Sequence, residues 1–268
     1  MRRMGNSDPF LTYLKSFGYS VVRLPRTDIR PLQVLVKEDT RLTRLGDLAT
    51  ILQPGARIAL PSIKENVAAA NVSGERTREL SIGVGLSILG SVIGAMGGSK
   101  IGLDTGYKQA RTAVFEFTDV LEDRVDLIDI DQYLTDADVS AFSSHAAQLL
   151  EADAVYVTTS TIKTRKFIVQ AKDSNGVALD VKVPEIQGVV GGSVKVSTSG
   201  GGDAKVAYEG NVPLVFGFQA ARLYYDNGRY TAFRPLVPGE TALESVTARS
   251  DPRGDYLVTD SPFVRLDA

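Results

Sequence analysis

Apolar and polar residues alternate along much of the second half of the chain, with the period of two that is typical of a half-buried β-strand. Within 167–183 one face carries Phe167, Val169, Ala171, Val177, Leu179, Val181 and Val183, with Asp173-Ser174-Asn175-Gly176 between its two halves. The Asn-Gly pair supplies the positive φ that a tight turn needs, so the pattern predicts a β-hairpin. A second hairpin is predicted from 194–198 to 204–208, around the glycines at 200–202.

The same alternation predicts further strands over 19–24, 32–36, 113–117, 155–161, 214–218, 221–225 and 230–233. Helical spacing of the apolar residues predicts helices over 10–17, near 42–52 and over 136–150. Asp8 and Pro9 suit the start of the first helix, and Gly18 suits its end. In the third helix the inward-facing residues are Val139, Phe142, Ala146, Leu149 and Leu150. The predicted fold class is α+β, with a mainly antiparallel β-sheet and flanking helices.

The segment 80–99 satisfies both periods. As a helix, it would place Ile82, Leu86, Leu89, Ile93 and Met96 along one seam, beside a small-residue face of Gly90, Gly94 and Gly98. As a strand, it would place Leu80, Ile82, Val84, Leu86 and Ile88 on one face and small residues on the other. The segment is therefore either a tightly packed buried helix or glycine-rich core strand, or a segment that changes secondary structure when it enters a membrane.

Composition and motifs give no support to an enzyme. The net charge of −2 argues against nucleic-acid binding, and the absence of cysteine removes thiol catalysis and thiolate metal sites. The one histidine, His145, follows Ser143 and Ser144, but on a helix these three side chains point in different directions, so a helix-surface histidine is expected rather than a catalytic base. A glycine-rich run at 94–100 lacks the residues that a phosphate loop needs around its lysine, and the acidic run 119–131 lacks the calcium-loop register. We expect no catalytic residue, cofactor or metal ion, and a solvated edge at 119–131.

The last residues differ in composition from the predicted sheet. The segment 247–255 is polar and contains Pro252 and Gly254, which is typical of an exposed linker. Beyond it, 256–268 is apolar for a chain end and is expected to lie in a groove. Alternating strands of this kind are needed both by soluble half-buried sheets and by transmembrane barrels. Together with the tail, they suggest a soluble protein that can become a β-lined pore.

The chain resembles the bacterial gasdermins. The residues that carry the resemblance are Ser7-Asp8-Pro9-Phe10-Leu11-Thr12-Tyr13-Leu14-Lys15 and Gly18-Tyr19-Ser20-Val21-Val22-Arg23-Leu24-Pro25, followed by the apolar segment 80–103, the hairpin region 165–210 and a short tail. The resemblance implies a gasdermin-like twisted sheet that forms pores and is autoinhibited until a partner protease removes the C-terminal peptide. The freed domain would oligomerise in the inner membrane and kill the cell as antiphage defence. Many relatives carry an acylated cysteine near the N-terminus, and residues 1–10 contain none.

These inferences divide the chain into a pore-forming domain (1–246), a protease-sensitive linker (247–255) and an autoinhibitory peptide (256–268). The candidate cleavage residues are Arg249 and Arg253 for a trypsin-like protease and Asp251 and Asp255 for a caspase-like one, with Pro252 blocking a cut after Asp251. The candidate anchors of the peptide are Tyr256, Leu257, Phe263 and Leu266.

The membrane-inserting candidates are Ile82, Val84, Leu86, Ile88, Phe167, Val169, Val177, Leu179 and Val181. Lys163, Arg165, Lys166, Lys172 and Lys182 form a basic cluster around one hairpin and are the candidate contacts to anionic lipid headgroups. The protein is expected to be a cytoplasmic monomer before cleavage and a large homo-oligomeric pore in the inner membrane afterwards. The alternative is a non-enzymatic, soluble, β-rich interaction protein with no membrane step.

Overall fold

The structure is a computed structural model of the 268-residue chain. It describes residues 19–26, 28–38, 41–70, 73–74, 76, 79–95, 101–140, 144–181, 194–199, 204–233 and 266–267. The predicted helix at 10–17 lies outside these residues.

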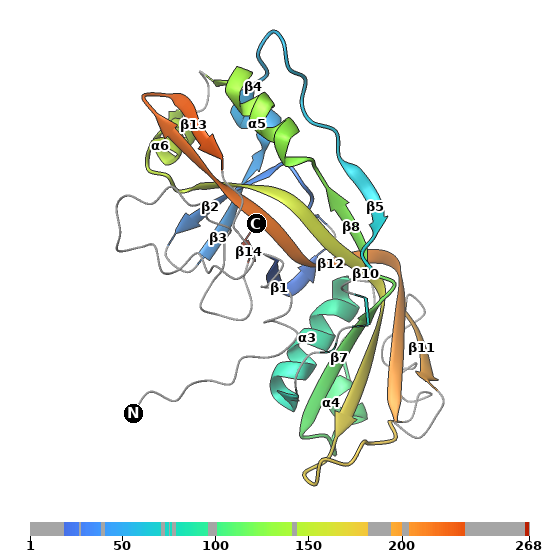
Figure 1. The fold of residues 1–268 in the computed structure, drawn as a ribbon. Coiled ribbons are helices and arrows are strands. Elements are labelled where there is room, and N and C mark those ends of the chain that lie inside the picture. Colours follow the sequence, from blue (N-terminus) through green and yellow to red (C-terminus); the bar gives the residue numbers. More distant parts are fainter. Residues whose placement is uncertain are drawn as a thin grey trace.

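Two long antiparallel strands, β10 (Val155–Lys172) and β12 (Lys205–Asp226), run through the whole molecule and join its two halves (Figure 1). The sequence predicted five shorter strands over these stretches, and they merge here into two. The β10–β12 register shifts three times, at Thr158/Ser160, Ile162/Lys163 and Thr164/Lys166. Such shifts are β-bulges, which increase local twist and bend a strand. They lie between the two halves, in a region that we call the waist (residues 158–166 of β10 and the strands that flank them).

In the upper half, helices pack against the N-terminal part of β10 and the C-terminal part of β12. Its strands are β1 (Ser20–Arg26), β2 (Gln33–Glu38), β3 (Arg41–Asp47), β4 (Leu52–Gln53), β5 (Lys64–Ala68), β8 (Leu121–Arg124), β9 (Asp138–Val139) and β13 (Arg229–Phe233). Its helices are α2 (Leu48–Ile51), α5 (Leu127–Asp136) and α6 (Ser144–Glu151). One apolar core, which includes Tyr133, Leu134 and Val157, lies between these helices and the sheet. The Asp226-Asn227-Gly228 turn joins β12 to β13 as predicted.

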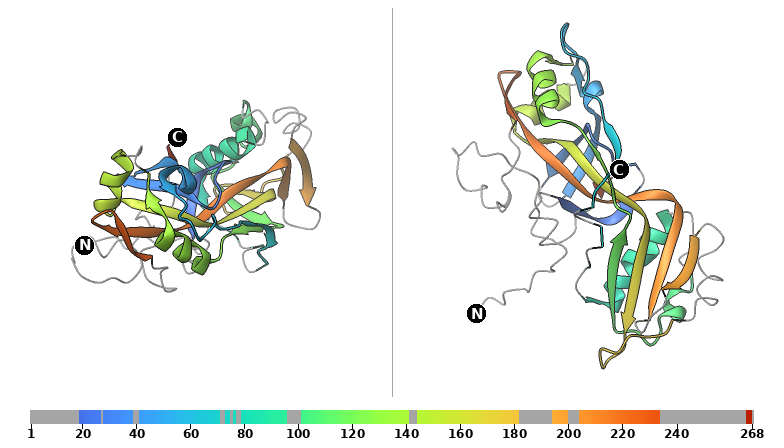
Figure 2. Two further views of the ribbon diagram at one scale, coloured as in Figure 1. Left: turned by 90° about the horizontal axis from the view of Figure 1, so that it is seen from above. Right: turned by 45° about the vertical axis from the view of Figure 1, so that its right-hand side comes forward.

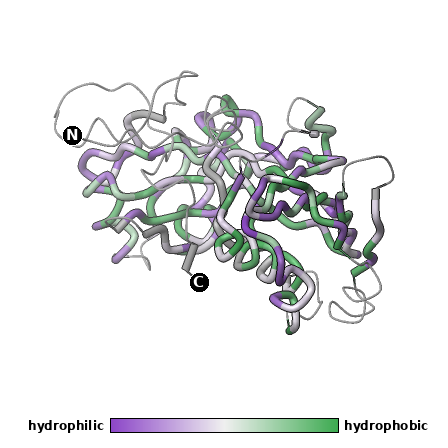
Figure 3. The backbone as a smooth tube through the Cα atoms, turned by 90° about the horizontal axis from the view of Figure 1, so that it is seen from below, coloured by the Kyte–Doolittle hydropathy of each residue, from purple (hydrophilic) through white to green (hydrophobic). Residues whose placement is uncertain are grey.

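The lower half contains the segments that the sequence singled out. It is formed by β6 (Leu80–Ser81), α3 (Ile82–Ala95), α4 (Leu103–Gly106), β7 (Thr112–Thr118) and β11 (Val194–Ser199). The C-terminal part of β10 and the N-terminal part of β12 complete it. Helix α3 covers one face of this part of the sheet, as two views agree (Figures 1 and 2). Coloured by hydropathy, the backbone shows hydrophobic and hydrophilic residues interspersed through both halves (Figure 3). In the part of the chain that the structure describes, no helix combines the length and the hydropathy needed to cross a bilayer.

Two predicted helices are wrong or too long. The helix near 42–52 is a strand, β3, followed by the single turn α2, because 41–47 pairs with β2 in an antiparallel hairpin. The ladder of this hairpin satisfies the backbone of 41–47 and overrides the helical spacing of the leucines. The helix over 136–150 is shortened to α6, because Ala137 leaves the helical conformation and Val139 pairs with Leu52 of β4. The helix α5, which ends at Asp136, was not predicted. The predicted strand over 177–183 is wrong where it is described, because 177–181 forms no strand and only Ala178 makes an isolated bridge, to Lys172. The other predicted strands are confirmed within one or two residues where they are described.

Candidate membrane-inserting sheet

The region of interest is the lower sheet, which we define as β7, β11, 166–172 of β10 and 205–210 of β12. One face of it is apolar throughout. Phe167 pairs with Phe117 on one side and with Tyr208 on the other, and its ring stacks on that of Tyr208 at 5.1 Å between centroids. The same face continues with Ala113, Phe115, Val169, Ala171, Val194, Val196 and Val206, all buried. Because paired residues share a face, this apolar surface spans all four strands.

Helix α3 covers that apolar face. Ile88, Leu89, Val92 and Ile93 are buried in the same core cluster as the strand residues, and Ile82 and Leu86 pack against its edge. Gly85 is the point of closest approach, since a Cβ at this position would lie 2.8 Å from the Cβ of Ala113 on β7. A small residue is therefore needed there for the helix to lie flat on the sheet.

We call α3, α4 and Tyr107 together the cover of the lower sheet. The second contact between this cover and the sheet is polar. The hydroxyl groups of Tyr107, which follows α4, and Tyr208 share a buried hydrogen bond of 2.8 Å. Burial raises the pKa of Tyr107, and burial together with the neighbouring Tyr107 raises that of Tyr208, so both phenols are neutral.

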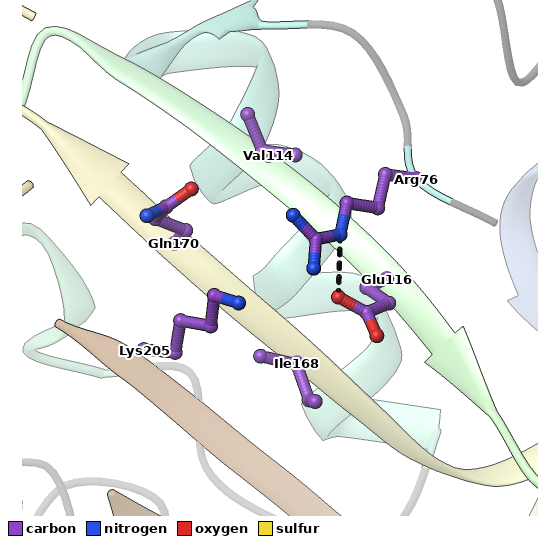
Figure 4. A pocket seen from close by; sticks show the side chains of 6 residues that line it. All are labelled: Arg76, Val114, Glu116, Ile168, Gln170 and Lys205. Atoms are coloured by element: carbon purple, nitrogen blue, oxygen red, sulfur yellow. Dashed lines mark ion pairs between the residues drawn. The ribbon is translucent and has the colours of Figure 1, made fainter. Parts of the chain in front are cut away.

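The opposite face of the lower sheet is polar. Residues 112, 114, 116 and 118 of β7 alternate with the buried ones, and the same alternation holds along β10. Arg76 forms an ion pair with Glu116 at 2.8 Å on this face, beside a shallow depression also lined by Ile168, Gln170 and Lys205 (Figure 4). The lower sheet therefore has one apolar and one polar face, with a helix over the apolar one.

The predicted membrane-inserting residues come from three kinds of environment. Phe167 and Val169 are buried on the apolar face, Val181 is buried beside it, and Leu179 packs against it. Ile82, Val84, Leu86 and Ile88 lie on the helix α3, of which Val84 is 45% exposed. Val177 lies in the turn after β10 and is 60% exposed. The predicted turn is present at 173–176, with Gly176 at φ +77°, and Leu179 donates a backbone hydrogen bond to Ala171.

The predicted basic cluster is only partly at the surface. Lys163 is paired with Asp123 at 2.5 Å, and both side chains are only 12% exposed. Arg165 is exposed at a bulge, Lys166 is half-buried, and Lys172 pairs with Glu79. Lys182 lies outside the described residues. Contact of Lys163 with a headgroup would first require its pair with Asp123 to open.

The acidic run was expected to be a solvated edge, and part of it is instead built into the waist. Glu122 accepts hydrogen bonds from Tyr19 and Ser160, both at 2.6 Å, and Asp123 accepts one from the Asn66 N–H at 2.8 Å. Burial and the Glu122 carboxylate raise the pKa of Tyr19. No sequence signal pointed to these contacts, because they join residues far apart in the chain. Within the described ranges no group of His, Cys, Asp and Glu is arranged to hold a metal ion.

The end of the chain returns to the sheet. Residues Leu266–Asp267 form β14, which pairs in parallel with β3, Leu266 opposite Leu42 and Asp267 opposite Thr43. The candidate cleavage residues Arg249, Asp251, Arg253 and Asp255 and the candidate anchors Tyr256, Leu257 and Phe263 lie outside the described residues.

Known proteins similar to this chain agree with the resemblance seen in the sequence. Residues 22–229 match the profile of the Bacterial Gasdermin Family. The chain is 56% identical over 259 residues to Gasdermin bGSDM of a Desulfuromonadales bacterium, covering 97% of both chains, and 41% identical to that of Lysobacter enzymogenes, covering 90% of both. Its fold is similar to a solved bacterial gasdermin from Bradyrhizobium tropiciagri, with a TM-score of 0.63, 17% identity and 97% coverage of both chains. The fold class expected from the sequence is confirmed.

Proposed function

The chain belongs to the bacterial gasdermin family, and on that premise we propose that it is an autoinhibited pore-forming protein activated by proteolysis. The observation that carries the proposal is the two-faced lower sheet with helix α3 over its apolar face. A transmembrane β-strand needs about 9–11 residues that alternate between apolar and polar. The strand β10 alternates from Lys166 to Lys172, and its partner strands alternate in register with it.

The segment of α3 is suited to extend this pattern. Leu80 pairs with Ala113, so both lie on the apolar face, and the N–H of Ile82 donates to the carbonyl of Arg111 at 2.8 Å as the next step of the ladder. If 82–88 became a strand in the same register, Ile82, Val84, Leu86 and Ile88 would continue the apolar face. The intervening residues are Gly83, Gly85 and Ser87, which tolerate a water-facing position. Glycines also lower the helix propensity of α3, so its helical state depends on the sheet beneath it.

Activation requires that the cover leave the sheet, and we propose that the C-terminal peptide 256–268 restrains this step. Ordering these residues costs about 1–2 kcal/mol each, which offsets most of what their burial contributes. While the linker 247–255 is intact, the peptide rebinds at high effective concentration, and after a cut it diffuses away. A trypsin-like protease would cut after Arg249 or Arg253, and a caspase-like one after Asp255.

After release, the domain would bind lipid and assemble. Anionic headgroups attract exposed lysines and arginines such as Arg165 by roughly 1 kcal/mol each. A single chain contributes too few strands to close a barrel, so a large homo-oligomer in the inner membrane is required. Such a pore would abolish the membrane potential and kill the cell, which suits a defence that limits phage spread.

The test uses full-length protein in which 247–255 is replaced by the recognition sequence of a site-specific protease. Dye-loaded vesicles containing anionic lipid should stay intact with the uncut protein and leak after the protease is added. A scrambled recognition sequence controls for the protease itself. Intact vesicles after complete cleavage would overturn the proposal and favour the alternative, an interaction protein with no membrane step.

A further inference from the structure

The polar face of the lower sheet carries an excess of positive charge, and we propose that it makes the pore selective for anionic solutes. This inference rests on the proposed function, because it concerns which face of the sheet would line the channel. It concerns the solutes that pass, and it is independent of how the pore is activated.

All charged residues of the lower sheet lie on one face. They are Lys166, Lys172, Lys195 and Lys205 against Glu116 and Glu209, which gives a net charge of +2 per chain. The register places them together: Lys166 is opposite Glu209, which is opposite Lys195 on the next strand. No charged residue of the lower sheet lies on the face covered by α3. The whole chain has a net charge of −2, so this face is positive although the chain as a whole is negative.

The charges are not evenly spread along the strands. Lys166, Glu209 and Lys195 share one level, where the net charge is +1, and Glu116 lies opposite Ile168 one step further along that face. Lys205, opposite Gln170, and Lys172 follow toward the hairpin end, with no acidic residue of the lower sheet at their levels. At about 3.3 Å per residue, Lys172 is roughly 20 Å from Lys166. The positive excess is therefore concentrated at the end of the sheet that is furthest from the waist.

Two charged residues that pair with the lower sheet add no net charge to it. Arg76 and Glu79, which precede α3, contribute one charge of each sign, and they pair with Glu116 and Lys172 respectively. Figure 4 shows Arg76, Glu116 and Lys205 on the same side of β7 and β10. A charged residue on the lipid side of a barrel strand is destabilising near the midplane, so this face is the one that would meet water. In a closed oligomer each chain repeats the same charges around the channel, and a ring of one sign concentrates its counter-ions.

The experiment measures the charge preference of release. Vesicles of fixed lipid composition are loaded with two dextrans of equal size, one anionic and one cationic, and the full-length protein with the engineered linker is cut in place. At about 10 mM salt, where the Debye length is roughly 30 Å, the anionic probe should leave about threefold faster than the cationic one. At about 1 M salt the Debye length falls to roughly 3 Å, and the two rates should become equal.

Two variants and a control assign the effect to this face. Lys172→Gln with Lys205→Gln removes the net charge and should abolish the preference at low salt, while Lys172→Glu with Lys205→Glu should invert it. Arg57→Glu with Arg229→Glu makes the same change in charge on exposed residues of the upper half and should leave the preference unchanged. Failure to release either probe would refute pore formation itself. Release with no preference, or with a cationic preference, at low salt in the unaltered protein would refute this inference while leaving pore formation intact.

Discussion

The hydroxyl oxygens of Tyr107 and Tyr208 lie 2.8 Å apart in the core of the lower half. Tyr107 is 2% exposed and Tyr208 is fully buried, so neither hydroxyl can exchange this partner for water. The bond links the segment after α4 to β12, and therefore joins the cover of the lower sheet to the sheet itself. Release of the cover must break this contact.

We expect Tyr208→Phe to destabilise the folded chain by about 1–3 kcal/mol, because it leaves the Tyr107 hydroxyl buried without a partner. The double variant Tyr107→Phe with Tyr208→Phe removes both polar groups and should recover most of that loss. Denaturant unfolding of the single and double variants measures the effect. If the double variant loses as much unfolding free energy as the two single variants together, or more, the loss does not come from an orphaned hydroxyl.

The second prediction compares two neighbouring positions that are alike in the folded state but face opposite sides in the proposed inserted strand. Val84 and Gly83 both lie in the first turn of α3 and are both exposed, and nothing lies within 4 Å of a Cβ at Gly83. Aspartate at either position should leave the folded protein unharmed, since a negative charge is favourable at a helix N-terminus.

In the extended register the two positions face opposite sides. Val84→Asp would put a charge toward lipid, which is destabilising near the midplane although less so than a lysine or arginine there, and should reduce leakage after cleavage several-fold. Gly83→Asp would face water and should leak like the unaltered protein. Equal leakage from both variants in the vesicle assay would show that 82–88 does not insert as a strand in this register.

The third prediction concerns the waist. The ion pairs Lys163–Asp123 and Lys64–Asp126 have the same separation of 2.5 Å, but the first is 12% exposed at both side chains and the second about half exposed. Asp123→Asn leaves the Lys163 ammonium in a largely dry site and should cost about 3–5 kcal/mol of unfolding free energy. Asp126→Asn should cost less than about 1 kcal/mol.

A second substitution tests the cause. Lys163→Met added to Asp123→Asn removes the unpaired charge, and the double variant should be more stable than Asp123→Asn alone. Urea unfolding at neutral pH measures all three proteins. If Asp123→Asn and Asp126→Asn are equally mild, the Lys163–Asp123 pair does not hold the waist.

The sequence predicted the strands of the lower sheet well, because each has one buried face and one face toward solvent. The alternation around Phe167 and the Asn-Gly turn are local signals, and both are present in the structure. The segment 42–52 failed for the opposite reason. Its leucines have helical spacing, but 41–47 pairs with β2, which precedes the segment, so the pattern within 42–52 by itself did not reveal the hairpin. The bonds from Tyr19 and Ser160 to Glu122 join positions 103 and 38 residues apart, so no motif could have revealed them.

The last prediction concerns the chain end. Leu266 and Asp267 pair in parallel with Leu42 and Thr43 at the edge of β3, so the final residues are tied to the sheet by backbone hydrogen bonding rather than by side chains alone. A two-residue ladder is weak, and we expect its loss to free the peptide 256–268. Deleting 266–268 should therefore let the full-length, uncut protein cause vesicles to leak, and Phe263→Ala with Leu266→Ala should do the same.

Asp267→Asn keeps the backbone and serves as the matched control, which should cause no leakage until the linker is cut. Denaturant unfolding of each variant distinguishes a released peptide from a misfolded domain. If the deletion and the double variant fold normally and remain silent until the linker is cut, the restraint lies elsewhere in the chain and the C-terminal peptide is not the inhibitor.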